Sequence, residues 1–262
     1  MGSATTQATV ATVDALAAAG GVTLDDSREL FDAAHALSDS PQLASALADA
    51  AAPEQARTQL VATVFGGLGE TSRSLLTTAV QQRWSSPADL VDGVEELAVR
   101  AASIAAASAD VEGELFGVSR LVAANPSLEL ALGSRLGESA KKGELVESLL
   151  RGKVSEATIL IASRVIQQPR ERRVRQLLSR AERLVSQQRG RAVATVYSAT
   201  TLTEEQTERL RRSLAARTGR DVSLNLVVEP TVIGGIRVEV GDDVIDATVS
   251  SRLGELRQRL AG

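Results

Sequence analysis

The spacing of apolar residues divides the chain into a long helical part and a shorter part with a different period. Up to about residue 189, apolar side chains recur every three or four positions, as in Ser72–Arg83 and Ser155–Gln168, which predicts amphipathic helices. At Gly190 the period changes to two, and Arg191–Ala199 (RAVATVYSA) is typical of a strand. The pattern therefore predicts a mostly α-helical protein that ends in a small α+β domain.

The helical part contains an internal duplication with an offset of 85 residues. Glu29-Leu30-Phe31 aligns with Glu114-Leu115-Phe116. Ser40-Pro41 aligns with Asn125-Pro126, and each pair is typical of an N-cap followed by proline at the first helical position. Chance similarity between helices rich in Ala and Leu is the alternative, but matched proline and glycine positions over a long ungapped stretch argue against it. We therefore expect two tandem helical bundles.

The two copies are predicted to join inside one helix. Ser86-Pro87 begins a helical pattern that only Gly93 interrupts before Ser108. The last helix of the first copy is therefore expected to run into the first helix of the second. The predicted domains are a first helical bundle at 1–97, a second helical bundle at 98–189 and the α+β domain at 190–262.

Capping and turn signals predict the elements of the α+β domain. Thr203 and Gln206 form a capping box at the start of a helix, and Gly219 is suited to ending it. Pro230 turns the chain between strands. The expected later elements are strands at Val222–Glu229, Val232–Val240 and Val244–Asp246, a hairpin at Gly241-Asp242, and a last helix at Thr248–Leu260.

The composition excludes several kinds of functional site. The chain has no cysteine and a single histidine, His35, so disulfides, thiolate or histidine metal sites and most catalytic triads are excluded. No glycine-rich loop precedes a lysine as phosphate binding requires. His35 fits a solvated or capping role better than a catalytic one, and Trp84 fits a core anchor better than a ligand platform. We expect no catalytic residue, cofactor or metal.

Charge is distributed unevenly along the chain. Residues 1–97 hold four Arg against thirteen Asp and Glu, a net charge of −9, whereas the whole chain has a net charge of −4. Such asymmetry suggests different partners for the two ends. The arginine-rich run at 164–191 contains no Phe or Trp and no Tyr, so a solvated face or a protein contact is favoured over nucleic-acid binding. No apolar stretch is long enough to span a membrane.

Residues 227–253, VVEPTVIGGIRVEVGDDVIDATVSSRL, carry a specific resemblance. They resemble the C-terminal signature of ATP synthase delta subunits, the family that includes the mitochondrial oligomycin-sensitivity-conferring protein. The resemblance extends over 98–262, and the first bundle departs from it as an added domain. The matching signature positions are Pro230, Ile233, Gly234, Gly235, Val238, Gly241, Asp246, Ser250, Arg252 and Leu253.

Two positions of the signature also have a physical interpretation. Gly234-Gly235 inside a predicted strand suggests a bulge or a close approach of another backbone segment. Asp246 is expected either to cap the last helix or to pair with Arg252.

The resemblance implies a non-catalytic stator subunit of a bacterial F-type ATP synthase. A helical bundle would bind the N-terminal helices of alpha subunits, and the α+β domain would bind the C-terminal region of the b subunit, at the cytoplasmic face of the plasma membrane. The chain would resist rotor torque during proton-driven ATP synthesis. Composition and duplication alone leave open a helical scaffold or adapter of an unrelated complex.

By the same resemblance, the groove for the alpha-chain helix lies between the first and fifth helices of a bundle. Those helices are expected at about 5–19 and 71–83 in the first copy, and at about 94–108 and 155–168 in the second. The predicted groove residues are Val13, Leu75, Ala79 and Val80 in the first copy, and Ile104, Ile159, Ala162 and Ile166 in the second.

Overall fold

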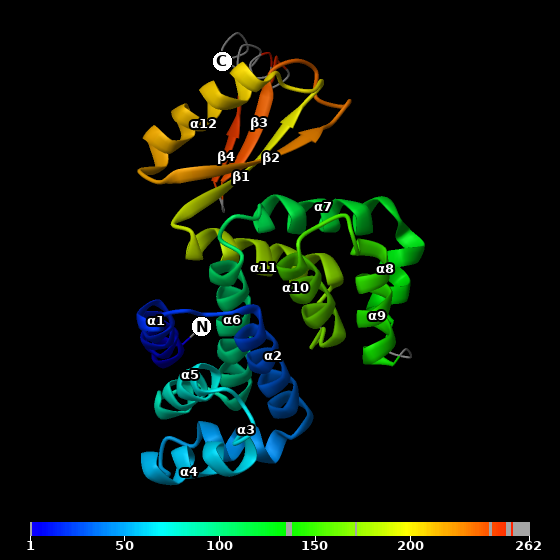
Figure 1. The fold of residues 1–262 in the computed structure, drawn as a ribbon. Helices are drawn as coiled ribbons and strands as arrows, with labels where there is room; N and C mark the ends of the chain where they lie inside the picture. The colour runs from blue at the N-terminus through cyan, green and yellow to red at the C-terminus, as the bar shows by residue number, and fades with distance from the viewer. Residues whose placement is uncertain (1, 135–137, 171, 241–242, 250–252, 254–262) are drawn as a thin grey trace, which may run out of the picture. The chain divides into compact units, whose positions relative to one another are not determined.

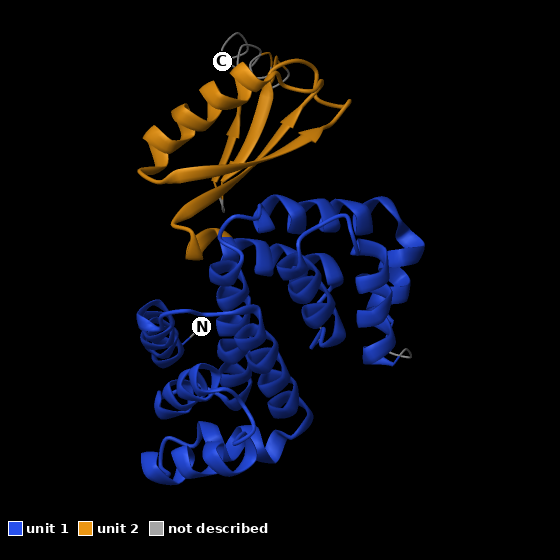
Figure 2. Ribbon diagram, viewed as in Figure 1, with its two compact units in different colours: residues 1–185 blue, residues 186–262 orange. Residues whose placement is uncertain are grey.

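A computed structural model describes the whole chain except residues 1, 135–137, 171, 241–242, 250–252 and 254–262. The chain divides into two compact units, residues 1–185 and residues 186–262, which are described separately (Figure 2). The predicted change of structure near Gly190 thus falls close to the unit boundary, and the last helix of unit 1 continues into the first residues of unit 2.

Unit 1 is built from helices joined by short loops, as the apolar spacing predicts (Figure 1). In chain order they are α1 (Ser3–Ala18), α2 (Leu24–Asp39), α3 (Pro41–Ala48), α4 (Glu54–Val64), α5 (Glu70–Gln81), α6 (Pro87–Ala105), α7 (Val111–Ala124), α8 (Pro126–Gly133), α9 (Ser139–Leu150), α10 (Glu156–Gln167) and α11 (Val174–Gln188).

Helix α6 is shared by the two copies of the duplication. Its N-cap Ser86 accepts a hydrogen bond from the backbone N–H of Asp89, and Pro87 takes the first helical position. The helix passes through Gly93 without a break, so the expected fusion of the two copies is confirmed. The predicted boundary between residues 97 and 98 lies inside α6, and both bundles belong to one compact unit.

Gly93 permits Trp84 to pack directly against α6. A Cβ atom at this position would lie 2.2 Å from Cη2 of Trp84. Trp84 is 5% exposed, and its indole N–H donates to the carbonyl oxygen of Ala79 at 2.7 Å. The expectation that Trp84 anchors the core is therefore confirmed.

The helices of the second copy repeat those of the first in order and spacing. Helices α3 and α8 each begin at a proline, 85 residues apart. One expected detail is wrong: Ser40 caps α3, but Asn125 makes no such bond at α8. The Asn125 amide donates instead to the carbonyl oxygen of Leu121 at 2.7 Å. Its side chain therefore caps the C-terminal end of α7 and not the N-terminal end of α8.

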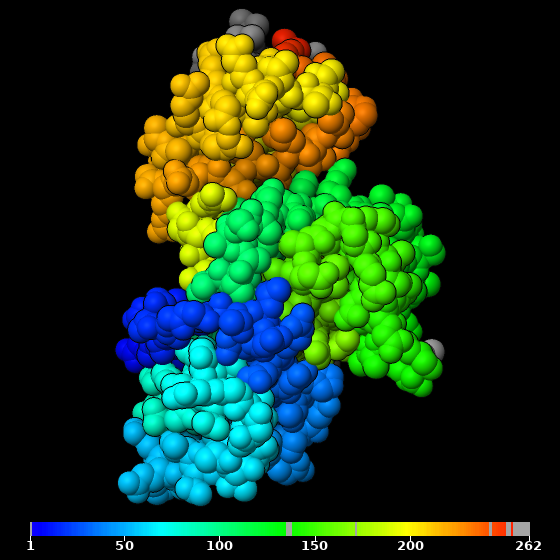
Figure 3. Space-filling view, in the orientation of Figure 1, coloured from blue at the N-terminus to red at the C-terminus, as the bar shows by residue number. Residues whose placement is uncertain are grey.

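The core of unit 1 runs continuously through both copies. Leu30, Leu76 and Leu97 of the first copy and Leu115 and Ile161 of the second belong to one cluster, and each is 1% exposed or less. Small side chains fill the spaces between them, which fits a chain with an aromatic content of only 2%. In Figure 3 the segments of the first copy, blue to cyan, gather at one end of unit 1 and those of the second copy, green, at the other.

Unit 2 is a four-stranded mixed sheet with the strand order β2-β1-β3-β4. Strands β1 (Arg191–Ser198) and β2 (Asp221–Val228) are parallel, and helix α12 (Glu204–Thr218) connects them. Strands β3 (Ile236–Val240) and β4 (Asp243–Asp246) form the antiparallel side. Figure 1 shows α12 lying across one face of the sheet. The core of unit 2 is Ala194, Val196, Leu214, Val222 and Val238.

The connection through α12 is the one that the sequence predicts. Thr203 and Gln206 form the expected capping box. Gly219 ends the helix with φ 68°, in the left-handed region that glycine adopts most readily. The predicted α+β fold of this unit is therefore confirmed.

One predicted strand begins later than expected. The strand placed at Val232–Val240 starts at Ile236, because Gly234 and Gly235 have φ values of +66° and +78° and form a turn. The hairpin at Gly241-Asp242, the signature residues Ser250 and Arg252, and most of the last helix predicted at Thr248–Leu260 lie outside the described residues.

Candidate interaction surfaces

The signature sequence forms a turn that packs against the chain just after β4. The backbone N–H of Ala247 donates to the carbonyl of Ile236 at 3.0 Å, and that of Val249 donates to Gly234 at 3.2 Å. A Cβ atom at Gly235 would lie 2.4 Å from the carbonyl oxygen of Ala247. The double glycine therefore permits a close backbone approach, which is one of the two roles expected for it.

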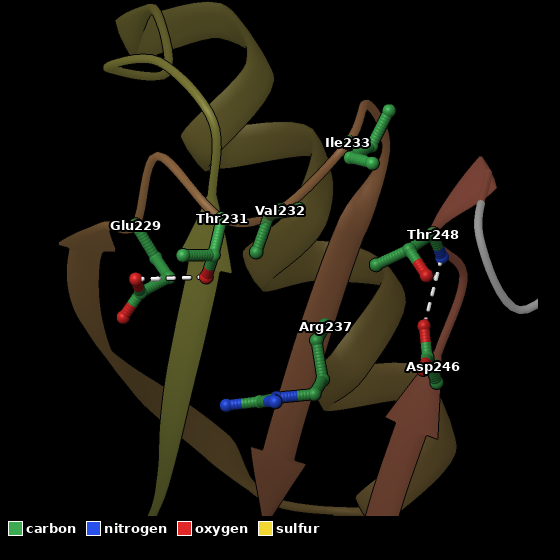
Figure 4. A pocket seen from close by; sticks show the side chains of 7 residues that line it. All are labelled: Glu229, Thr231, Val232, Ile233, Arg237, Asp246 and Thr248. Carbon is green, nitrogen blue, oxygen red and sulfur yellow. Dashed lines mark hydrogen bonds between the residues drawn. The ribbon is translucent and has the colours of Figure 1, made fainter.

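A polar cavity of about 260 Å³ opens beside this turn (Figure 4). The hydroxyl of Thr231 donates to Glu229 at 2.9 Å, and the backbone N–H of Thr248 donates to Asp246 at 2.9 Å. Hydrogen bonding from Thr248 lowers the pKa of Asp246. Asp246 thus fixes the turn that leads out of β4. The cavity is lined by Glu229, Thr231, Val232, Ile233, Arg237, Asp246 and Thr248.

Two exposed apolar side chains lie at this turn. Ile233 is 70% exposed and Val249 is 45% exposed, and a Cβ atom at Gly234 would lie 3.1 Å from the Val249 side chain. We call these two residues the signature patch. Exposed apolar residues that cluster on a small domain commonly mark a protein contact. On β3, the Arg237 guanidinium lies 4.3 Å from the centre of the Tyr197 ring, and the Tyr197 hydroxyl donates to Glu239 at 3.2 Å.

In the first copy, the predicted groove residues lie mainly in the core. Leu75 is 3% exposed, and Ala79 and Val80 are each 0% exposed. Val13 on α1 is half-buried. The neighbouring Val10, which the sequence pattern did not indicate, is 56% exposed. Helices α1 and α5 do pack together, but the accessible apolar surface of this pair lies on α1.

In the second copy, the predicted groove is covered by the chain itself. Ile159 is 8% exposed, Ala162 and Ile166 are each 0% exposed, and Ile104 is half-buried. Helix α2 packs on both α6 and α10. The hydroxyl of Ser27 on α2 donates to the carbonyl of Ala98 on α6 at 2.8 Å.

Polar pairs fix α2 in this position at its other end. Arg164 on α10 donates to Asp32 on α2 at 2.7 Å. The Gln168 amide donates to Asp39 at 3.4 Å. Both pairs link the acidic first copy to the basic second copy within unit 1.

Several arginines of the 164–191 run serve internal ion pairs rather than a solvated face. Arg180 donates to Glu95 on α6 at 2.7 Å, and Arg170 pairs with both Asp92 and Glu95. Arg172 is also paired with Asp92. Exposed sites in the run include Arg173 and Arg183, so the expected solvated face applies to only part of it.

The ion-pair network shifts its two carboxylates in opposite directions. Burial raises the pKa of Glu95 despite the nearby arginines. Burial also opposes ionisation of Asp92, but the hydrogen bond from Arg172 and the charges of Arg170 and Arg180 together lower the pKa of Asp92. This partly buried network links α6 to Arg180 on α11 and to Arg170 and Arg172 in the segment just before α11. It contains no nucleophile–base pair.

The described residues contain no cluster of three or more His, Cys, Asp or Glu side chains placed to hold a metal ion. Within the same part of the chain, no helix has both the length and the apolar character needed to cross a membrane.

Comparison with known proteins identifies the family. The sequence profile described as ATP synthase delta (OSCP) subunit matches residues 96–260. The chain belongs to this family. ATP synthase subunit delta of Leifsonia xyli subsp. xyli is 44% identical over 264 residues, which cover 100% of both chains. The proteins of the same name from Streptomyces avermitilis and Thermobifida fusca are 40% and 38% identical, over 82% and 95% of this chain and 81% and 94% of theirs.

The family profile begins inside α6, so it covers the second copy and unit 2. The first copy lies outside the profile, yet the Leifsonia xyli delta subunit matches the chain over its whole length. The added bundle is therefore shared with that relative. Membership in the delta subunit family replaces the alternative of a scaffold for an unrelated complex.

Proposed function

We propose that this chain is a stator subunit that joins the catalytic head of an F-type ATP synthase to its peripheral stalk. The observation that carries the proposal is the family match over residues 96–260, supported by the full-length match to the Leifsonia xyli delta subunit. The chain performs no bond chemistry. It resists rotor torque during proton-driven ATP synthesis, as a peripheral subunit at the cytoplasmic face of the bacterial plasma membrane.

The contact with the head is assigned to α1 and α5 of the first copy. Its occupant is an N-terminal helix of an alpha subunit, bound along its apolar face. Val10, 56% exposed, and half-buried Val13 supply accessible apolar surface on α1. With the offset of 85 residues they correspond to Glu95 and Ala98 on α6, where Arg170 and Arg180 pair with Glu95 and Ser27 of α2 donates to the carbonyl of Ala98.

The packing of α2 supports the first copy as the one that binds a partner. The second copy already holds a helix of the same chain on its α6–α10 pair. A partner helix at that place would first have to displace α2, with the buried hydrogen bond of Ser27 and the ion pair of Asp32. Binding at Val10 and Val13 of the first copy would require no such displacement. Its net charge of −9 favours a partner helix with basic residues at its rim.

The contact with the stalk is assigned to unit 2. The signature patch, Ile233 and Val249, gives an apolar surface beside a polar cavity. Such a surface suits the C-terminal region of the b subunit. Its apolar residues would cover the patch while its polar groups meet Glu229 and Arg237 at the cavity.

Recovery with the complex tests the proposal. An affinity tag on the chain, expressed at its native level, should recover alpha and b subunits from solubilised membranes. Membrane vesicles that lack the chain should lose ATP-driven proton pumping, while the released heads still hydrolyse ATP. Normal pumping and retained heads in such vesicles would contradict the proposal.

A further inference from the structure

Two adjoining hollows mark a surface of the second copy that the proposed head and stalk contacts do not use. The first, of about 300 Å³, lies between the end of α8 and the start of α11, and the second, of about 350 Å³, lies along α11. Arg173 lines both of them. We call this region the arginine surface and define it by Leu130, Arg173, Arg175, Gln176, Ser179 and Arg183.

The arginine surface carries unneutralised positive charge. Arg173 and Arg183 are exposed, and neither forms an ion pair with another described residue. Arg175 is half-exposed and lies 2.9 Å from Glu129 at the rim. The positive end of the α11 dipole, at Val174, adds to the field beside Arg173. This part of the chain therefore attracts anions, in contrast to the acidic first copy.

The same surface offers an apolar anchor. Leu130 is 76% exposed, more than any other large apolar side chain in the described part of the chain. It lines the first hollow together with Pro169 and the buried Val174. An exposed leucine at the mouth of a hollow gains free energy when a partner covers it.

The spacing of these groups fits a helix. Arg173 and Arg183 are ten residues apart, which corresponds to about 15 Å along α11. Gln176 and Ser179 lie between them and supply neutral hydrogen-bonding groups. Carboxylates that recur every three or four residues over about ten residues of a partner helix match the length of this row.

We propose that the arginine surface binds an acidic amphipathic helix of a partner protein, with an apolar side chain on Leu130 and carboxylates at Arg173 and Arg183. Charge complementarity selects this occupant. A nucleic acid is disfavoured because the 164–191 run has no aromatic side chain in its helical part for base stacking and the whole chain has a net charge of −4. The proposal does not depend on the alpha and b contacts assigned above.

The probe for this proposal is a labelled helical peptide of about 18 residues, with leucines on one face and glutamates flanking them. Its binding to the full-length chain is measured by fluorescence anisotropy. The double substitution Arg173→Glu and Arg183→Glu should weaken binding by at least about tenfold, and Leu130→Asp should weaken it as well. Arg120→Glu, at an exposed arginine on α7, is the matched control and should leave the affinity unchanged.

Two further peptides separate this proposal from general electrostatic attraction. A scrambled peptide of the same composition should bind at least about tenfold more weakly. A peptide with lysines in place of glutamates should prefer the doubly substituted chain. Equal loss with Arg120→Glu, equal binding of the scrambled peptide, or tighter binding of single-stranded DNA would overturn the proposal. All four substituted side chains are exposed, and circular dichroism checks that the variants remain folded.

Discussion

Glu114 on α7 holds Ser155, the N-cap residue of α10, by accepting hydrogen bonds from both its backbone N–H at 3.1 Å and its hydroxyl at 2.5 Å. The equivalent residue of the first copy, Glu29, accepts a bond from the backbone N–H of Gly69, the N-cap residue of α5, at 2.9 Å. The duplication has therefore preserved a carboxylate on the second helix of each copy that fixes the start of the fifth helix.

The two carboxylates differ in how many donors they satisfy, which gives a prediction for stability. Glu114 also accepts a bond from the buried Thr158 hydroxyl, whereas Glu29 accepts one exposed bond. Glu114→Ala should lower the free energy of unfolding by about 2 kcal/mol, and Glu29→Ala by about 1 kcal/mol or less. Urea denaturation measures both. Equal losses would show that the extra bonds contribute nothing.

Gly93 should tolerate no larger residue while Trp84 is present. Gly93→Ala places a methyl group against the indole ring, so we expect a loss of about 1–3 kcal/mol in unfolding free energy. Gly117→Ala on α7 is the control, because a Cβ there meets nothing within 4 Å, and it should stabilise the helix by about 0.5–1 kcal/mol. In a Trp84→Ala background, the cost of Gly93→Ala should shrink. Thermal and urea unfolding of the four variants would test this.

The pair of Asp92 and Arg172 should make stability depend on pH in the acid range. The folded state lowers the pKa of Asp92, so its contribution is complete above the unfolded value and is lost as the pH falls through the lowered folded value. Asp92→Asn should reduce the free energy of unfolding at neutral pH. It should also make that free energy fall less steeply between about pH 5 and about pH 2. Glu95 has a raised pKa, so it acts in the opposite sense and loses its contribution as the pH rises. Asp14→Asn, at an exposed site on α1, serves as the control in denaturation curves across this range.

Val10 should be required for binding an N-terminal helix of the alpha chain. Val10→Asp puts a charge on the exposed apolar surface of α1 without disturbing the core. We expect at least about tenfold weaker binding of an alpha N-terminal peptide, measured by titration calorimetry. Val64→Asp, on α4 at 47% exposure, should bind normally. If Val64→Asp has the same effect, or neither variant does, the assignment to α1 and α5 is wrong.

The signature patch should be required for attachment to the stalk. Ile233→Asp should weaken binding of a fragment from the C-terminal end of the b subunit by at least about tenfold, because Ile233 is 70% exposed and contributes to no core. Removal of residues 190–262 should abolish that binding. Leu121→Asp, on α7 at 41% exposure, is the control in the same pull-down and calorimetric assays. Full binding by the truncated chain would exclude unit 2 as the stalk site.

Local signals in the sequence were sufficient for much of the fold. Apolar spacing located the helices, the capping box at Thr203 located α12, and the offset of 85 residues revealed the duplication. These signals depend on neighbours within a few residues, or on repetition, and so are visible without coordinates. The family resemblance located the signature turn, although Gly234-Gly235 proved to precede a strand rather than lie inside one.

Contacts between distant segments could not be predicted in the same way. The predicted groove residues Ala162 and Ile166 have the right period for an amphipathic helix, but the period does not say that other helices of the chain bury them completely. Likewise, Arg170 and Glu95 are far apart in the chain, and the sequence gives no sign that they pair. The arginine run was therefore expected to face solvent. Both features are set by which helices become neighbours in the folded bundle.

The shared helix α6 also constrains how this chain can change during evolution. One residue inserted in an α-helix turns everything beyond it by about 100° and advances it by about 1.5 Å. Both bundles contain part of the same uninterrupted helix. An insertion within Pro87–Ala105 would therefore rotate one bundle relative to the other and separate Asp32 from Arg164. A flexible linker would absorb such a change. Length variation among delta subunits with this architecture should therefore fall in the loops and spare α6.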